Sequence, residues 1–238
     1  MESACTRWRR IRYAKEEAMI RTVGATARAL VLVALLYAIT AAAPVLSPAA
    51  VHANPGAPVP RVGHDAGMYG EPAVAAAYWR EQHASDCGEM AVADVVGQVT
   101  GRQPTEQQII ALAENTSSTA GPGPIWKPTG FTNIRDLPIL LWHYGIKANN
   151  VQTDIDALKQ KLREGHKIIV ILNAETIWNR PGKRNSGNHF VVVTGIDTRS
   201  GVVHLNDSAI NTGRDEKVSL ATFEQAWAPN FYSAIVTQ

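Results

Sequence analysis

Cys87, in the stretch "HASDCGEM", is the residue of this 238-residue sequence with the clearest potential for chemistry. The only other cysteine is Cys5, near the start, so no second cysteine in the rest of the chain could pair with Cys87. Cys87 follows Asp86 at the predicted start of a helix, where unsatisfied backbone N–H groups and the helix dipole favour a thiolate. These features predict a nucleophile, and a small apolar residue buried in the core is the alternative.

A base for this thiol is expected far along the sequence, and His189 is the candidate. It begins the apolar run "HFVVVTG", which predicts a strand, 102 residues after Cys87. Asp207 lies 18 residues further on, where an antiparallel return would bring it beside His189 to fix the imidazole tautomer. Asn206 is the neighbouring candidate. Because side chains alternate along a strand, only one of the two can face the same cleft as His189.

The order of these residues resembles the papain-like double-glycine leader peptidases, peptidase family C-thirty-nine, and their exported single-domain relatives. The resemblance lies in a glutamine shortly before Cys-Gly, a late Gly-x-His followed by an apolar strand, and Asn-Asp in the next strand. The matching residues are Gln82, Cys87-Gly88, Gly187-Asn188-His189-"FVVVTG" and Asn206-Asp207. "YWREQ" and "ADVVGQVTGRQPTE" also resemble a set of exported actinobacterial proteins, so the resemblance covers roughly residues 71–238.

The resemblance implies a papain-like cysteine peptidase fold and a role for each of four residues. It implies that Cys87 attacks a peptide carbonyl, that His189 is the general base and that Asp207 orients it. Gln82 would donate to the oxyanion, although it lies five residues before the cysteine, where papain-like enzymes usually place this glutamine six before. Glu81 occupies that other position. The implied function is hydrolysis of peptide bonds in a peptide or protein substrate, through an acyl-enzyme.

Other interpretations keep the same residues. A cell-wall peptide hydrolase or an amide transferase would use the same triad on another substrate, and a non-catalytic binding module would keep the fold without turnover. No cofactor is expected, and the cysteine and histidines lack the spacing of a zinc site. "GPGPIWKPTG" only imitates a phosphate-binding loop in composition, so no ATPase is expected in this chain.

The elements that must position these residues fall into two halves. Helical patterns dominate the first half, and they cover 71–82, 87–100, 105–115, 133–144 and 153–164. Strand patterns dominate the second half, in "KIIVILNA", "HFVVVTGID", "VVHLND" and "FYSAIVTQ", with the helix "LATFEQAWA" before the last strand. Runs of helices followed by runs of strands predict an α+β fold, with the cysteine helix packed on a C-terminal antiparallel sheet.

Loops and tryptophans are expected to shape the cleft. The stretch 115–130 is too rich in glycine, proline and serine for a helix or strand, and a loop of this length is more often functional than idle. Together with 174–188 it is expected to line the site, with Trp126 and Trp178 as candidate walls. Trp79, Trp142 and Trp227 have apolar neighbours at helical spacing and are expected in the core.

The first 53 residues have the order of a secretory signal peptide. Arginines precede the apolar run "ALVLVALLYAITAAA", which is shorter than the roughly 20 residues of a membrane-spanning helix. Cleavage is expected after Ala53, and Met19 is a possible alternative start. Residues 54–70 are expected to be a flexible lead-in to a papain-like domain over 71–238.

The charge of the chain resides mainly in this leader. The whole sequence has a net charge of +2, whereas residues 54–238 carry 16 Lys+Arg against 18 Asp+Glu. No basic run remains, so a nucleic-acid partner is not expected. Export would place the domain outside the cell or in the cell envelope, held by a membrane anchor if the leader is not cleaved.

Overall fold

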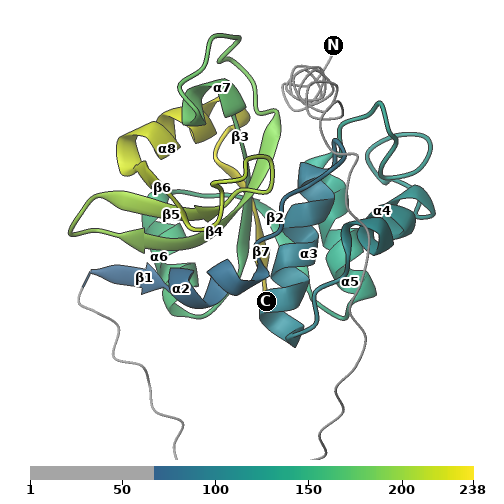
Figure 1. Ribbon diagram of the computed structural model, residues 1–238, viewed down its shortest axis with the longest axis horizontal. Helices are drawn as coiled ribbons and strands as arrows, with labels where there is room; N and C mark the ends of the chain where they lie inside the picture. The colour runs from purple at the N-terminus through teal and green to yellow at the C-terminus, as the bar shows by residue number, and fades with distance from the viewer. Residues whose placement is uncertain (1–66) are drawn as a thin grey trace, which may run out of the picture. The chain divides into compact units, whose positions relative to one another are not determined.

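An antiparallel seven-stranded sheet organises the part of the chain that the computed structural model describes, residues 67–238 (Figure 1). The strand order is β2-β7-β3-β4-β5-β6, and β1 pairs with the far end of β4. The strands are β1 (Met68–Gly70), β2 (Ala148–Gln152), β3 (Ile168–Leu172), β4 (His189–Asp197), β5 (Val202–Asn206), β6 (Glu216–Ser219) and β7 (Ser233–Thr237). The predicted leader and most of the predicted lead-in lie outside the described residues.

Helices cover both faces of this sheet. They are α2 (Pro72–Ala75), α3 (Cys87–Thr100), α4 (Glu106–Glu114), α5 (Leu137–His143), α6 (Ile155–Arg163), α7 (Ala174–Ile177) and α8 (Leu220–Trp227). Three short 3-10 helices are η1 (Ala76–Tyr78), η2 (Ile134–Asp136) and η3 (Ala228–Asn230). Within residues 67–238, no helix combines the length and the apolar character that crossing a membrane requires.

The sheet separates two apolar cores. Strand β3 is buried along its whole length. Its residues alternate between the two faces of the sheet, and both faces are covered. Ile169 and Ile171 pack into the core formed with α3, α4 and α5, whereas Val170 and Leu172 pack with α6 and α8. The α+β architecture predicted from the sequence, with the cysteine helix packed on the antiparallel sheet, is confirmed.

Helix α3 places Cys87 at its first turn and runs between the sheet and α4. It ends at Gly101, which adopts φ 72° and donates its N–H to the Gly97 carbonyl at 2.8 Å. A Cβ on Gly88 would lie 3.2 Å from Cδ2 of Phe190, so the first turn of α3 abuts the start of β4. The cysteine and histidine segments, far apart in the sequence, therefore meet here.

Several elements differ from the sequence-based expectation. Residues 68–70, assigned to the flexible lead-in, form strand β1, which is too short to show a periodicity in the sequence. The helix expected over 71–82 ends at Tyr78, because Trp79 adopts an extended conformation with ψ 134°. Strands β2 and β6 were not predicted, since none of their residues is fully buried and the sequence lacks a clear apolar alternation.

Of the three tryptophans that were expected in the core, only one is fully buried there. Trp227 is fully buried, in agreement with the prediction. The prediction for Trp142 is wrong, since 60% of its surface is exposed on α5, whose other face supplies the buried Leu140 and Leu141. Trp79 is held by a hydrogen bond in the candidate site instead.

Candidate functional site

His189 and Asp207 form a buried pair at the start of β4 and the end of β5. Nε2 of His189 lies 2.8 Å from Oδ1 of Asp207, and neither side chain is more than 1% exposed. Because β4 and β5 are antiparallel neighbours, the return predicted from the 18-residue separation is observed. Nδ1 of His189 is buried and has no hydrogen-bond partner among the described residues. A proton on Nε2, shared with Asp207, would leave Nδ1 as the basic nitrogen.

Asp207 is held from several directions. Its Oδ1 also accepts the Ala209 N–H at 2.8 Å, and its Oδ2 accepts Nε1–H of Trp178 at 3.0 Å. Its backbone carbonyl accepts Nε1–H of Trp79 at 2.6 Å. A Cβ on Gly213 would lie 1.9 Å from that same carbonyl oxygen, so this turn accepts no larger residue without moving. The carboxylate therefore has a fixed position beside His189.

Trp178 covers the His189–Asp207 pair. Its ring centroid lies 4.9 Å from that of His189, and the guanidinium of Arg180 lies 4.8 Å from the Trp178 ring centroid. The sequence predicted Trp178 as a candidate wall of the cleft, and the structure places it against the histidine. An indole in this position keeps water from the hydrogen bond between the imidazole and the carboxylate, which strengthens it.

Asn206, the alternative to Asp207, points elsewhere. Its Nδ2 donates to the Ala75 carbonyl at 2.9 Å and to Oδ2 of Asp94 at 2.8 Å. Burial raises the pKa of Asp94 to about 6, although hydrogen bonds from Gln98 and Asn206 oppose the shift. Strand alternation thus separates the two neighbours, and Asp207 is the one that meets His189.

Cys87 is the first residue of α3 and is 4% exposed. The segment before it is anchored on both sides. The carboxylate of Glu106 accepts the backbone N–H groups of His83 and Ala84, the latter at 2.8 Å, and Trp126 donates Nε1–H to the Ser85 carbonyl at 3.0 Å. These bonds fix the start of the helix, whose N-terminal field favours a thiolate.

Gln82 is buried beside the residue that follows Asp207. Its Oε1 accepts the hydroxyl of Ser208 at 2.7 Å, its backbone N–H donates to the Ser208 carbonyl at 2.9 Å, and its Nε2 donates to the Ala84 carbonyl at 2.8 Å. Glu81 is only half-buried. Gln82 is therefore linked through Ser208 to the segment that follows Asp207.

Sequence reasoning missed three contributors to this site. Trp79 was expected in the core. Because a buried indole N–H needs an acceptor, the sequence could have indicated that Trp79 makes a hydrogen bond. The roles of Ser208 and Gly213 could not be predicted from the sequence, because their contacts depend on the conformation of the turn after β5. Among residues 67–238, no group of three or more His, Cys, Asp or Glu side chains is placed to hold a metal ion.

Glu89 is a buried acid in the first turn of α3, two residues after Cys87. Its Oε1 accepts the hydroxyl of Thr132 at 2.6 Å, and its Oε2 has no hydrogen-bond partner in the described part of the chain. Burial raises the pKa of Glu89 to about 7, opposed by the bond from Thr132 and reinforced by nearby Asp136. A neutral Glu89 would not repel a thiolate at Cys87.

Because of the raised pKa of Glu89, the free energy of unfolding is predicted to depend on pH. Glu89→Gln should remove this dependence. The folded chain keeps a proton that the unfolded chain releases above the ordinary glutamate pKa of 4.5, so the free energy of unfolding falls as pH rises towards 7. The shift corresponds to about 3 kcal/mol. Urea titrations should therefore show Glu89→Gln gaining about 3 kcal/mol over the wild type between pH 4.5 and pH 8. Glu114→Gln, at an exposed glutamate of α4, is the control. Parallel curves for Glu89→Gln and the wild type would contradict the assignment.

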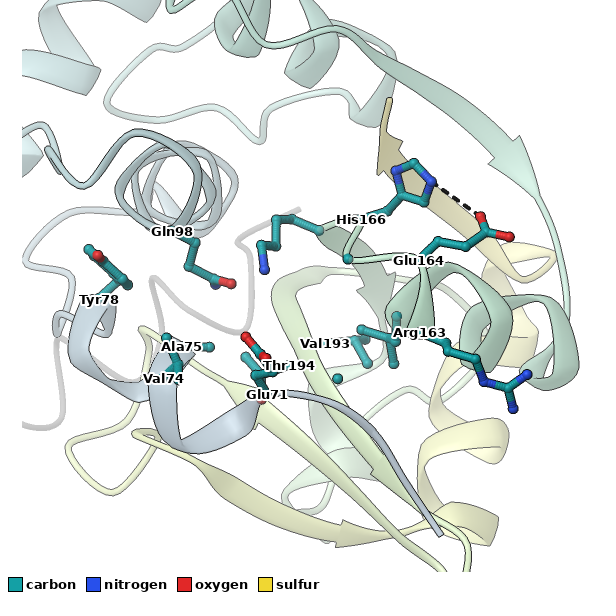
Figure 2. Close-up of a pocket in the computed structure, with 14 residues that line it drawn as sticks. Glu71, Val74, Ala75, Tyr78, Gln98, Arg163, Glu164, His166, Val193 and Thr194 are labelled. Atoms are coloured by element: carbon teal, nitrogen blue, oxygen red, sulfur yellow. Dashed lines mark ion pairs between the residues drawn. The ribbon is translucent and has the colours of Figure 1, made fainter. Parts of the chain in front are cut away.

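A pocket of about 280 Å³ lies at the other end of α3 (Figure 2). Gln98, one of its lining residues, is 11 positions after Cys87, which corresponds to about 16 Å along a helix. The pocket has no excess of either charge, because Arg163 and Lys167 are balanced by Glu71 and Glu164. It is therefore separate from the His189–Asp207 pair and shows no preference for a charged ligand.

Several known proteins are similar to this chain in sequence or in fold. Uncharacterized proteins of Mycobacterium tuberculosis and Mycobacterium bovis are 46% identical over 195 residues, covering 71% of this chain and 84% of theirs. A crystal structure described as that of a C39-like peptidase from Bacillus anthracis aligns with a TM-score of 0.55 and 20% identity, covering 72% of this chain and 97% of that one. This likeness shows a common fold. The model of the Peptidase C39-like family matches residues 67–235, and the chain therefore belongs to that family.

Proposed function

We propose that this protein is a cysteine peptidase that hydrolyses peptide bonds through an acyl-enzyme on Cys87. The observation that carries the proposal is the buried His189–Asp207 pair, whose outer nitrogen, Nδ1, has no hydrogen-bond partner among residues 67–238. A Cβ on Gly88 would lie 3.2 Å from Phe190, so the residue after the thiol lies close to the residue after the imidazole. This proximity supports the proposal that Cys87, His189 and Asp207 act together as nucleophile, base and orienting carboxylate.

The chemistry follows from these roles. Nδ1 of His189 takes the thiol proton, and Sγ of Cys87 forms a bond to the carbonyl carbon of the scissile peptide. The intermediate collapses as the C–N bond breaks, and the imidazolium returns its proton to the leaving amine. Water then attacks the thioester, with His189 as base, releasing the carboxylic acid and the thiol. Asp207 stabilises the imidazolium in both steps.

The oxyanion is assigned to two donors at the start of α3. The backbone N–H of Cys87 lies at the N-terminal end of α3, where the helix dipole is positive. Gln82 is proposed as the second donor because its amide is buried and oriented by Ser208 and Ala84. Two pre-oriented donors stabilise the charge that develops in the transition state.

The substrate is proposed to be an extended peptide or protein segment that lies between two loops, each of which is held in place by hydrogen bonds. Oδ1 and Oδ2 of Asp136 accept bonds from Thr119 and Ser118 and so hold the loop 115–130. Nδ2 of Asn173 donates to the carbonyls of Lys183 and Ser186 and holds the loop before His189. Walls fixed in this way favour a preformed cleft.

We further propose, from the signal-like leader, that the domain acts after export, outside the cell or in the cell envelope.

Alkylation of Cys87 tests the activated thiol. Iodoacetamide is expected to label Cys87 of the full chain at pH 5.5 at least about tenfold faster than it labels Cys87 of the urea-unfolded chain, because only a thiolate reacts. His189→Ala should lower the folded rate towards the unfolded one. Mass spectrometry of the Cys87 peptide gives both rates. Equal rates for folded and unfolded wild type would refute an activated nucleophile.

Products then distinguish the alternatives. A peptidase cleaves a mixed peptide library and leaves an acyl-enzyme on Cys87 that mass spectrometry detects after acid quenching. A cell-wall hydrolase would release peptides from purified peptidoglycan instead, and an amide transferase would form new amides with added amines. A binding module would retain a peptide ligand with no acyl-enzyme, and Cys87→Ser would leave that binding intact.

A further inference from the structure

Glu216 of β6 lies on the same face of the sheet as Asp207. It pairs across the strands with Leu205, and cross-strand partners point to the same side. Asp207 lies two residues after Leu205, so it shares that side as well. The face is covered by Phe223 and Trp227 of α8, which pack in the same apolar core as Leu205. A glutamate side chain in this place is directed into the region behind the His189–Asp207 pair.

The strand register directs the Glu216 carboxyl towards the Asp207 carboxylate. Its Oε2 is buried and has no hydrogen-bond donor as a partner among residues 67–238. Burial, the negative charge of Asp207 and a hydrogen bond with Asp207 raise the pKa of Glu216 to about 8, opposed by Arg180. A carboxyl group whose pKa lies near 8 keeps its proton at neutral pH, so Glu216 can donate a hydrogen bond to the Asp207 carboxylate.

The other charged groups around Glu216 do not replace this contact. Arg180 approaches from the segment between α7 and β4, where it also lies over Trp178. The neighbours of Glu216 along the strand, Asp215 and Lys217, belong to a separate cluster with His204, whose Nδ1 lies 2.7 Å from Oδ1 of Asp215. Helix α8 contributes the apolar side chains named above. Asp207 is therefore the group to which Glu216 is most directly coupled.

We propose that Glu216 is a positioning residue of the proposed active site, which donates a hydrogen bond to the Asp207 carboxylate and sets how firmly that carboxylate holds the His189 imidazolium. The inference rests on the proposed function. Oδ1 of Asp207 binds His189 and the Ala209 N–H, whereas Oδ2 binds Trp178. A further donor from Glu216 would restrain rotation of the carboxylate. When Glu216 ionises, this donor is lost and a second negative charge lies beside Asp207, which changes how the carboxylate holds the imidazolium.

Two substitutions separate these effects. Glu216→Ala removes the donor and should lower the rate of Cys87 alkylation at pH 6.5 about tenfold, which corresponds to the loss of one charge-assisted hydrogen bond. Glu216→Gln retains a neutral donor and should restore most of that rate. Because Gln cannot ionise, the inflection near pH 8 that Glu216 contributes to the pH profile of Cys87 alkylation should be absent from Glu216→Gln.

The control is Lys217→Gln, which removes a charge from the adjacent position in the separate His204–Asp215 cluster and should leave both measurements unchanged. Coincident pH profiles of Cys87 alkylation for Glu216→Gln and wild type would overturn the inference, as would a wild-type alkylation rate in a folded Glu216→Ala. If Glu216→Ala does not fold, the pH profile of Glu216→Gln decides. Failure of the proposed function has a different signature: wild-type Cys87 would then react no faster folded than unfolded.

Discussion

Replacing Cys87 by serine is expected to lower kcat/KM for peptide hydrolysis by at least about a thousandfold, since removing one member of a nucleophile–base unit removes its combined effect. The substitution replaces one atom, sulfur by oxygen, so we expect the buried start of α3 to keep its conformation. A hydroxyl at this helix terminus does not ionise near neutral pH as a thiol can, and the local helix field cannot compensate. The measurement is the initial rate on a peptide that the wild type cleaves, with acyl-enzyme formation followed by mass spectrometry.

Ala91→Ser is the matched control for this substitution. It places the same hydroxyl on the same buried helix one turn further on, where a serine can bond to the carbonyl four residues earlier. Hydrolysis should then stay within about threefold of the wild type, a change of less than 1 kcal/mol in the barrier. Undiminished hydrolysis by a folded Cys87→Ser would exclude Cys87 as the nucleophile.

Replacing Asp207 by asparagine is expected to lower kcat/KM about a thousandfold to ten-thousandfold, as loss of the orienting carboxylate does in other triads. The amide keeps the size of the side chain but carries no charge to stabilise the imidazolium. It also presents an NH₂ group to Trp178 or to His189, both of which donate to the present carboxylate. Much of the effect should appear in kcat, and alkylation of Cys87 at pH 5.5 should slow in parallel.

Asn206→Ala distinguishes an effect on chemistry from an effect on the fold. It removes two buried hydrogen bonds, to Ala75 and Asp94, one residue away from Asp207. The free energy of unfolding should fall by about 2 kcal/mol, because the partners lose their donor. The folded fraction should keep kcat/KM within about tenfold of the wild type, or about 1.4 kcal/mol. A loss as large as that of Asp207→Asn would contradict the assignment of Asp207 as the orienting residue.

Much of the site was accessible from the sequence because it depends on local patterns. Apolar alternation after His189 predicts a strand, and the 18 residues to Asp207 allow an antiparallel return, which the structure contains. The apolar spacing after Cys87 predicts a helix that begins at the thiol, and α3 begins there. These predictions succeed because the periods of helices and strands are properties of consecutive residues. Weak or very short patterns, such as those of β1, β2 and β6, failed for the same reason.

The tertiary structure decided what depends on long-range packing. The alternation of side chains allowed either Asn206 or Asp207 to face His189, and only the register of β4 and β5 selects Asp207. The cover by Trp178 and the anchoring of Gln82 by Ser208 join segments that no local pattern connects. Burial of the Glu89 and Glu216 carboxyls, which raises the pKa of each, likewise follows from the neighbours that the fold brings to them. The sequence alone determined the residue types and the elements with a clear periodicity, whereas desolvation and contact, on which reactivity depends, arise only when the elements pack.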